Sequence, residues 1–337
     1  GDDMKRRSQT LVFENRPKLI AGMSVVGKKE GDGPLGKYFD RIEDDPKMGK
    51  NTFEKGETAM LTEAVEGAAA KAGLKISDIG ALFAGDLLNQ LVSSSYAARD
   101  LPVPYFGLYS ACSTMTEAIA LAAACVNAGY YETAACATGS HFATAERQYR
   151  FPLEYGCQRP PYAQWTVTAA GCGIISADGD GPAVTHAAIG RVVDYGITDA
   201  NNMGAAMAVA AMDTAIAVFE ETRTSPEDYD AIFTGDLGRV GSEIMRDLCR
   251  EKGAELGQRY SDCGEMMFSA KQKCYSGGSG AGCSASVLNS FILGKMNARE
   301  YDRVLLLATG ALMSPTTSFQ GESIPSVCHG IILENDL

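Results

Sequence analysis

The sequence predicts an α/β fold in which two duplicated halves, related by a pseudo-twofold axis, form a five-layered sandwich of helices and sheets. Three observations lead to this prediction. Segments with the apolar spacing of helices alternate with short apolar segments typical of strands, which form βαβ units with right-handed crossovers. Landmarks of the first half return in the same order in the second half. The expected helices are rich in alanine and glycine, so they can lie close together between two sheets.

Length and composition narrow the class of protein. The 337 residues, 45% of them hydrophobic, can build a large core, and this excludes a disordered chain. The formal net charge of −12 excludes nucleic acid and anionic lipid as broad electrostatic partners, so an anionic ligand would need a local basic pocket. The ten cysteines contain no CxxC pair and are expected to stay reduced. The three histidines lack metal-ligand spacing, and no metal or cofactor is expected.

The duplication is clearest where a short apolar strand ends in Gly-Asp. The segment SDIGALFAGDLLNQ at 77–90 recurs as EDYDAIFTGDLGRV at 227–240. Farther along, ACST at 111–114 corresponds to GCSA at 282–285. Two more pairs follow in the same order: ATG at 137–139 with ATG at 308–310, and CGIISA at 172–177 with HGIILE at 329–334. Repeated landmarks in one order indicate an internal repeat of a whole structural unit.

The expected elements follow in order within each half. The first half, residues 1–182, is expected to contain strand 19–26, helix 57–73, strand 79–85, helix 113–128, strand 132–138 and strand 172–177. The second half, residues 183–337, is expected to contain strand 184–192, helix 205–222, strand 229–235, helix 284–297, strand 302–309 and strand 328–334. Each half also has an insertion. The insertion of the first half, at about 140–170, is expected to form a lid, and that of the second half lies at about 239–275. Such loops on a rigid scaffold commonly carry specificity.

Cys112 stands just ahead of an alanine-rich segment that reads as a buried helix. The duplication and this cysteine resemble the thiolase and ketoacyl-synthase superfamily, in which a cysteine at a helix N-terminus is acidified and accepts an acyl group. A more specific set of motifs resembles the stage V sporulation protein AD family of spore-forming bacteria. The motifs are GPLG (33–36), AGDLLNQ (84–90), ACST (111–114), SHFATAERQYRFPLEYG (140–156), DYGITD (194–199), DYDAIFTGDL (228–237), GGSGAGCSA (277–285) and ATGALMSP (308–315).

The superfamily chemistry also requires partners from the second half, and the sequence lacks them. A histidine is expected shortly after the first Gly-Asp-like strand end, but residues 234–238 read TGDLG. A second histidine or an asparagine is expected before the central helix, but residues 276–284 read SGGSGAGCS. Without these groups, thiolate chemistry would lose orders of magnitude in rate. We therefore expect no catalytic residue, with Cys112 as a vestigial nucleophile.

The resemblance implies a binding function instead. Members of the family are understood to bind dipicolinic acid, pyridine-2,6-dicarboxylate, and to take part in its uptake into the developing spore. Arginine forks and glutamine amides suit the two carboxylates, and an aromatic face suits the flat ring. The residues expected to contact the ligand are Cys112, His141, Arg147, Gln148, Arg150 and Tyr155, with Tyr149 or Trp165 as other aromatic candidates.

The resemblance also implies partners and a location. The partners are dipicolinic acid, with or without calcium, and other proteins of the same spore transport operon. Apolar runs such as RVLLLATGALM fall short of a bilayer span, and no signal peptide is recognised, so peripheral attachment to the spore inner membrane through partners is expected. A homodimer formed through edge strands of the first half is expected, because an open sheet edge tends to be covered.

Other interpretations stay open at this point. The protein could be an acyl-transferring enzyme that uses Cys112 with unusual partners, or an assembly scaffold without a ligand. Cys112 could be a small buried residue and His141 a core histidine. Arg147 and Arg150 could pair with nearby glutamates on the surface. Asp86 and Asp236 could cap helices.

Overall fold

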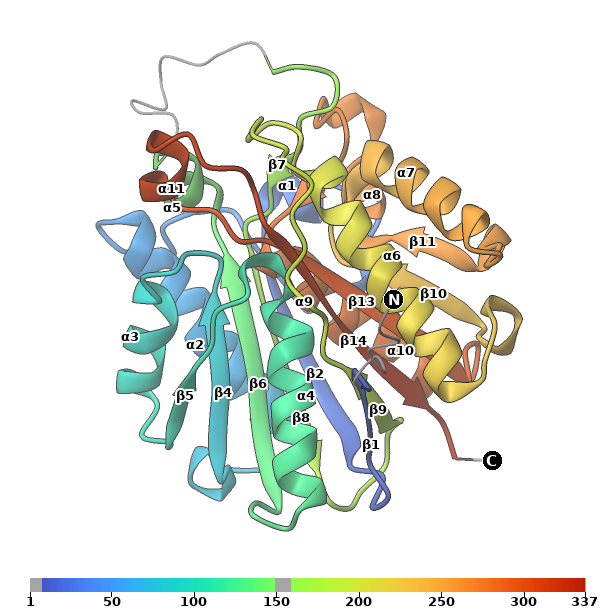
Figure 1. The fold of residues 1–337 in the computed structure, drawn as a ribbon. Coiled ribbons are helices and arrows are strands. Elements are labelled where there is room, and N and C mark those ends of the chain that lie inside the picture. Colours follow the sequence, from blue (N-terminus) through green and yellow to red (C-terminus); the bar gives the residue numbers. More distant parts are fainter. Residues whose placement is uncertain (1–7, 149–158, 337) are drawn as a thin grey trace.

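The structure is a computed structural model that describes residues 8–148 and 159–336. A long mixed sheet runs through the molecule with the strand order β11-β10-β13-β14-β9-β2-β8-β6-β4-β5. Helices cover both faces of this sheet, and further helices lie between its two arms (Figure 1). The order reads as two sets of five strands that meet where β9 lies beside β2.

The first set belongs to the first half of the chain. Its strands are β2 (Lys18–Gly27), β8 (Ala169–Ser176), β6 (Thr133–Ser140), β4 (Ala81–Asp86) and β5 (Tyr105–Gly107). Its main helices are α2 (Phe53–Lys71), α3 (Val92–Asp100) and α4 (Thr114–Asn127). The short elements are β1 (Thr10–Val12), α1 (Lys28–Gly31), β3 (Arg41–Glu43), α5 (Phe142–Glu146) and β7 (Trp165–Thr166).

The second set repeats the first. Its strands are β9 (Ala183–Ala188), β14 (Ser326–Glu334), β13 (Arg303–Ala311), β10 (Ala231–Thr234) and β11 (Tyr260–Asp262). Its helices are α6 (Met203–Thr222), α7 (Gly238–Glu251), α9 (Ala281–Val287) and α10 (Leu293–Asn297). The short elements are α8 (Cys263–Met267), β12 (Gly278–Ser279) and α11 (Pro315–Phe319). The order β9-β14-β13-β10-β11 thus repeats β2-β8-β6-β4-β5, which confirms the duplication.

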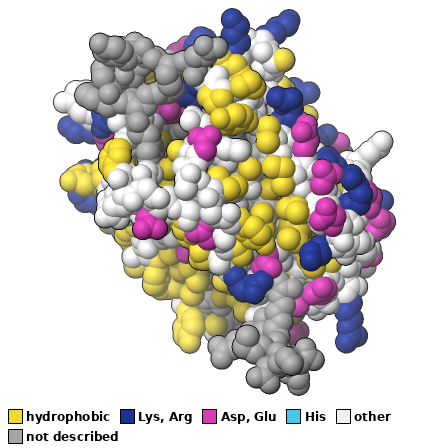
Figure 2. Space-filling model, turned by 45° about the horizontal axis from the view of Figure 1, so that its top comes forward, with side chains coloured by type: hydrophobic (Ala, Val, Ile, Leu, Met, Phe, Trp, Pro, Cys, Tyr) yellow, Lys and Arg dark blue, Asp and Glu magenta, His cyan; other side chains and the backbone are white. Residues whose placement is uncertain are grey.

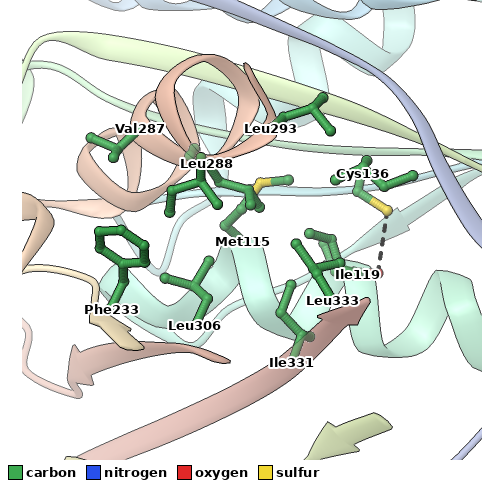
Figure 3. Close-up of a cluster of buried hydrophobic side chains, with 14 of the residues drawn as sticks. Met115, Ile119, Cys136, Phe233, Val287, Leu288, Leu293, Leu306, Ile331 and Leu333 are labelled. Carbon is green, nitrogen blue, oxygen red and sulfur yellow. Dashed lines mark hydrogen bonds between the residues drawn. The ribbon is translucent and has the colours of Figure 1, made fainter. Parts of the chain in front are cut away.

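The five layers follow from the packing of the helices. The two arms share a single residue pair, Lys18 with Ala183, and otherwise diverge. Helices α4, α9 and α10 fill the space between them, and Figure 3 shows side chains of α4, such as Met115 and Ile119, facing side chains of the second arm. Helix α2 packs on the outer face of the first arm and α6 on the outer face of the second. The predicted five-layered sandwich is confirmed.

Close approach between the layers requires very small residues. A Cβ atom added to Gly22 of β2 would lie 2.7 Å from the carbonyl oxygen of Asn289. A Cβ atom added to Gly171 of β8 would lie 2.4 Å from the carbonyl oxygen of Ala285. The glycine-rich and alanine-rich composition noted in the sequence therefore brings α9 and the turn that follows it directly onto the first arm.

The expected elements differ from the structure mainly at the second central helix and in the second insertion. The helix expected at 284–297 begins at Ala281 and contains a π-helical turn at Leu288–Ile292. The insertion at 239–275 is not a loop, because it contains α7, β11 and α8. The limits of the two halves at residues 182 and 183 stay a prediction.

Helix α6 corrects one expectation about apolar segments. A stretch of 18 residues within this 20-residue helix has a mean hydropathy of 1.4, so by length and composition the helix could cross a bilayer. In the fold, 61% of that stretch is buried, and the helix packs on β13, β14 and α7. A core helix between a sheet and a neighbouring helix meets the same test, because burial in protein also favours an apolar sequence.

Candidate functional site

A cavity of about 400 Å³ lies over Cys112, where the two halves meet. Three walls come from the strand end at Leu87–Asn89, the described part of the first-half insertion and the segments around Ala200 and Met313. Polar groups on these walls are Asn89, Glu146, Gln148, Arg159, Gln164, Thr166, Asn201, Ser279 and Ser314. In Figure 2 hydrophobic side chains gather in the middle of the face formed by the top of Figure 1, where α5, β7 and α11 lie.

The backbone around Cys112 is held in a tight turn. Ala111 has a φ of 51°, an unfavourable left-handed conformation for a residue with a side chain, and Cys112 follows at the start of the segment that leads into α4. Gly310 of β13 makes room for this turn, since a Cβ atom there would lie 2.1 Å from the carbonyl oxygen of Ser110. The second half thus supports the turn that presents the thiol to the cavity.

The thiol of Cys112 faces a carboxyl group. This is Asp236, which follows the end of β10 and is buried. The Asp236 carboxylate also accepts hydrogen bonds from the Gly280 backbone N–H at 2.7 Å, from Thr309 Oγ1 at 3.1 Å and from Ser279 Oγ at 3.2 Å. Burial raises the pKa of Asp236 to about 7. Burial, and then the charge of Asp236, raise the pKa of Cys112 well above its ordinary value, so the sulfur stays a thiol.

The two second-half sequences that lack the superfamily partners both lie at Cys112. Residues 234–238 bring Asp236 to the thiol, and residues 276–284 bring Ser279 and Gly280 to Asp236. A buried carboxyl group and a hydroxyl therefore stand where condensing chemistry needs an imidazole or an amide. This arrangement disfavours a thiolate, and among the described residues it places no cationic proton donor beside the sulfur.

Asp262 fixes the Asp236 strand end and was not anticipated from the sequence. It is buried and accepts hydrogen bonds from the backbone N–H groups of Leu237 at 2.8 Å and Gly238 at 2.9 Å. It also accepts from Thr234 Oγ1 at 2.7 Å and caps α8 through the Glu265 N–H at 2.9 Å. Burial raises the pKa of Asp262 to about 6. The second insertion thus supports the strand end below the cavity through Asp262, although none of its side chains lines the cavity.

Among the described residues that line the cavity, the cationic side chain is Arg159. Its guanidinium donates to Glu146 Oε1 at 2.8 Å and to the Gln164 carbonyl oxygen at 2.5 Å. It also lies 4.8 Å from the centre of the Trp165 ring. Sequence reasoning missed Arg159, although it lies in the insertion that was expected to form the lid.

Gln164 joins the first-half insertion to the second half. Its side-chain amide donates to the carbonyl oxygens of Asp236 and Gly278, each at 2.7 Å. Next to it, β7 pairs in parallel with β12, joining Trp165 to Gly278. Residues 164–166 of the first-half insertion are therefore bonded to the strand end that carries Asp236 and to β12.

The structure divides the residues expected to contact a ligand. Cys112 and Gln148 line the cavity. His141 does not: it is buried at the start of α5, its Nδ1 accepts from the Ala143 N–H, and its Nε2 donates to the Pro46 carbonyl oxygen at 2.8 Å. Burial lowers the pKa of His141. His141 therefore lies away from the cavity wall, bonded to the backbone of residues 46 and 143.

The aromatic and arginine candidates lie in several different places. Arg147 points away from the cavity and forms an ion pair with Glu54 of α2. The Trp165 ring is already covered, because it stacks on Phe142 at 4.2 Å and has Lys29 4.3 Å from its centre. The residues Tyr149, Arg150 and Tyr155 lie outside the described part of the chain. Within the described ranges, no group of three His, Cys, Asp or Glu side chains could hold a metal ion.

Comparison with known proteins gives one family and one fold. The family profile of stage V sporulation protein AD matches residues 7–334. Stage V sporulation protein AD of Bacillus subtilis (strain 168) is 43% identical over 326 residues, covering 97% of this chain and 96% of that protein.

Solved structures of condensing enzymes share the fold. The 3-oxoacyl-[acyl-carrier-protein] synthase III of Aquifex aeolicus VF5 matches with a TM-score of 0.56 and 13% identity, over 95% of this chain and 100% of that chain. The corresponding enzyme of Xanthomonas oryzae pv. oryzae matches with a TM-score of 0.59 and 13% identity, over 96% and 100%. At this identity the likeness shows the fold alone, which is the thiolase-like fold expected from the sequence.

Proposed function

Because this chain belongs to the stage V sporulation protein AD family, we propose that its role in sporulation is to bind dipicolinic acid in the cavity over Cys112 and to take part in its uptake. The observation that supports this most is the pairing of a retained cavity with a thiol that faces Asp236. A site that has space for a ligand, and whose cysteine stays protonated and therefore unreactive, suits binding without turnover.

The chemistry of the cavity fits a small planar acid. Its volume of about 400 Å³ lies within the range of about 300–1,000 Å³ that is typical of small-molecule sites. Arg159 offers a planar fork that matches a carboxylate, and Gln148 and Asn201 offer amide donors. Apolar walls such as Leu88 and Met313 suit the two faces of a ring. On this proposal a carboxylate of the ligand replaces Glu146 as the partner of Arg159.

The wider setting belongs to the same proposal. The protein acts with other proteins of its spore transport operon, lies peripherally at the spore inner membrane through those partners, and takes its ligand with or without calcium. It forms a homodimer through β5, the edge strand of the first arm, where Phe106 is 45% exposed.

Isothermal titration with dipicolinate tests the ligand assignment. Arg159→Ala should weaken binding by about 1.5–3 kcal/mol, the value of a hydrogen bond to a charged group, or about 10- to 150-fold in Kd. Arg159→Lys should restore only part of it, because an ammonium group has no planar fork. Arg147→Ala is the matched control, since its ion pair with Glu54 lies off the cavity wall.

The titration also has clear contrary outcomes. Isophthalate, which has the same two carboxylates without the ring nitrogen, should bind more weakly than dipicolinate. Thermal unfolding of each variant checks that the chain is folded, because removing Arg159 leaves Glu146 without one of its partners. A folded Arg159→Ala that binds like the parent, or loss of binding in Arg147→Ala alone, would refute the assignment of the site.

A further inference from the structure

One wall of the cavity over Cys112 offers hydrogen-bond acceptors. The side chains that form it are Gln164, Thr166 and Ser279, which all line the cavity, and we call them the acceptor wall. Gln164 and Ser279 are only 9% and 4% exposed, so bulk solvent has little access to them. Each of the three side chains donates all its polar hydrogens to atoms of the protein, and this leaves its oxygen for whatever fills the cavity.

Gln164 is the clearest member of the acceptor wall. Its Nε2 donates one hydrogen to the Asp236 carbonyl oxygen and the other to the Gly278 carbonyl oxygen, each at 2.7 Å. Two carbonyl oxygens can face only the nitrogen of an amide, so the orientation of this side chain is fixed. Its Oε1 accepts no hydrogen bond from the residues that the structure describes. A donor on a bound molecule would satisfy this oxygen, whereas a second acceptor there would leave it unpaired.

The two hydroxyl groups follow the same pattern. Ser279 Oγ donates to the Asp236 carboxylate at 3.2 Å, and Thr166 Oγ1 donates to Glu146 Oε1 at 3.2 Å. A hydroxyl group has a single hydrogen, so each of these oxygens keeps only its lone pairs for the cavity. A molecule that carried acceptors alone would therefore leave all three oxygens of the acceptor wall without a donor.

The charges around the cavity favour an acid that is not fully ionised. Among the described residues that line the cavity, Arg159 is cationic and Glu146 is anionic. A dicarboxylate with two negative charges would add both of them to a wall whose own charges cancel, and burying unpaired charge is costly. A single proton on the dicarboxylate halves its charge. The same proton supplies the donor that the acceptor wall requires.

We propose that the cavity binds dipicolinate as its singly protonated monoanion, with the ionised carboxylate at Arg159 and the remaining acid hydrogen donated to the acceptor wall. Arg159 donates to the backbone carbonyl oxygen of Gln164 at 2.5 Å, so the cation and the acceptor wall are direct neighbours. This inference rests on the proposed function and deepens it, because it names the form of the ligand that the site accepts. Dipicolinate that is fully ionised in solution must then take up one proton from solvent when it binds.

Isothermal titration of the full chain with three probes tests the role of the donor. The probes are dipicolinate, its monoamide, in which a carboxamide replaces one carboxylate, and the matching methyl ketone, in which an acetyl group replaces it. The monoamide carries one negative charge and an N–H donor throughout the neutral pH range. The methyl ketone has the same shape and charge without the donor. The monoamide should bind about tenfold more tightly, the effect of one hydrogen bond to a buried acceptor that otherwise stays unpaired.

The pH dependence of dipicolinate binding provides the second measurement. Carboxyl groups ionise with a pKa near about 4, so the singly protonated fraction of free dipicolinate falls about tenfold for each pH unit above roughly pH 6. Relative to the Kd of the monoamide, which has no proton to gain, the Kd of dipicolinate should rise by the same factor. Titrations in two buffers with different ionisation enthalpies should also show about one more proton taken up per dipicolinate than per monoamide.

The monoamide is also the control for groups of the protein that titrate. Burial raises the pKa of Asp236 to about 7, so its ionisation weakens the binding of any anion over the same pH range. That effect acts on both probes, and the comparison removes the part that they share. The titratable and charged groups around the acceptor wall, one or more from each neighbouring element, are Lys29, Cys112, Glu146, Arg159, Asp236 and Asp262.

The possible outcomes separate this inference from the proposed function. Dipicolinate that binds with the same Kd from pH 6 to pH 8, or that takes up no more protons than the monoamide, would overturn the inference and leave the proposed function intact. Failure of the monoamide to bind where dipicolinate binds, or equal binding of the monoamide and the methyl ketone, would do the same. No binding of dipicolinate at any pH would refute the proposed function and this inference with it.

Discussion

Replacing Asp236 by asparagine should stabilise the protein at neutral and alkaline pH. Asp236 is fully buried beside Cys112, and the side chains that face it are Cys112, Ser279, Thr309 and, more distantly, Asp262. None of these is a cation. An amide of the same shape keeps the hydrogen bond from Gly280 and carries no charge, so it avoids the cost of burying an anion.

The size and sign of the effect follow from the shift of the Asp236 pKa. Folding raises this pKa from 3.8 to about 7, and one pKa unit corresponds to about 1.4 kcal/mol, so the full difference is about 4 kcal/mol. Between these two values the folded protein holds a proton that the unfolded chain has released. The stability contributed by Asp236 is therefore complete below about pH 4 and is lost as the pH rises through about 7.

Urea unfolding at pH 5, 6, 7 and 8 measures the effect. Asp262 and Glu30 have raised pKa values too, so the parent should lose stability over this range for several reasons. The difference between Asp236→Asn and the parent isolates one of them and should grow by about 2.7 kcal/mol from pH 5 to pH 8, most of it below pH 7. The exposed Asp178→Asn is the control and should track the parent. A difference that is constant with pH, or that shrinks toward pH 8, would refute the reasoning.

Three other predictions concern Cys112 and the assembly. Purified protein should catalyse no thiolysis or condensation of acyl-CoA, because Cys112 stays a thiol; turnover that disappears in Cys112→Ala would contradict this and favour an acyl-transferring enzyme. Light scattering should report a homodimer at micromolar concentration, and Phe106→Asp on the β5 edge should weaken it; a monomeric parent would count against the prediction. Gly310→Ala should lower the unfolding temperature by several degrees, because its Cβ would collide with Ser110, whereas the unobstructed Gly294→Ala should not.

The repeated pattern made the fold and the family readable from the sequence. Strand ends such as Asp86 and Asp236 recur at equivalent places because each half folds as the same unit, and their spacing is independent of side-chain detail. The resemblance to the stage V sporulation protein AD family is confirmed by the match over residues 7–334. Both inferences depend on the order and spacing of motifs along the chain, and small errors in the limits of individual helices and strands do not change these.

The residues of the site were harder to predict from the sequence, because the site depends on the direction of single side chains. Arg147 and Gln148 are adjacent, yet one pairs with Glu54 on α2 and the other lines the cavity. A short helix turns successive side chains by about 100° each, and the sequence of the lid does not fix its starting angle. Arg159 was missed for a related reason: it follows α5 in irregular backbone, and Glu146 and Gln164 fix its position.

The two halves have diverged at equivalent positions, and this explains where the site lies. Asp86 caps its own half, accepting hydrogen bonds from the Ser94 N–H and Oγ, each at 2.9 Å, at the start of α3. Its counterpart Asp236 reaches across to Cys112 of the other half. The first half supplies the thiol and the insertion that contains Gln164. The second half supplies the carboxyl group that keeps the thiol protonated and the carbonyl oxygens that accept from Gln164. Neither half alone contains the cavity, so the duplication persists as architecture while the function depends on the differences between the copies.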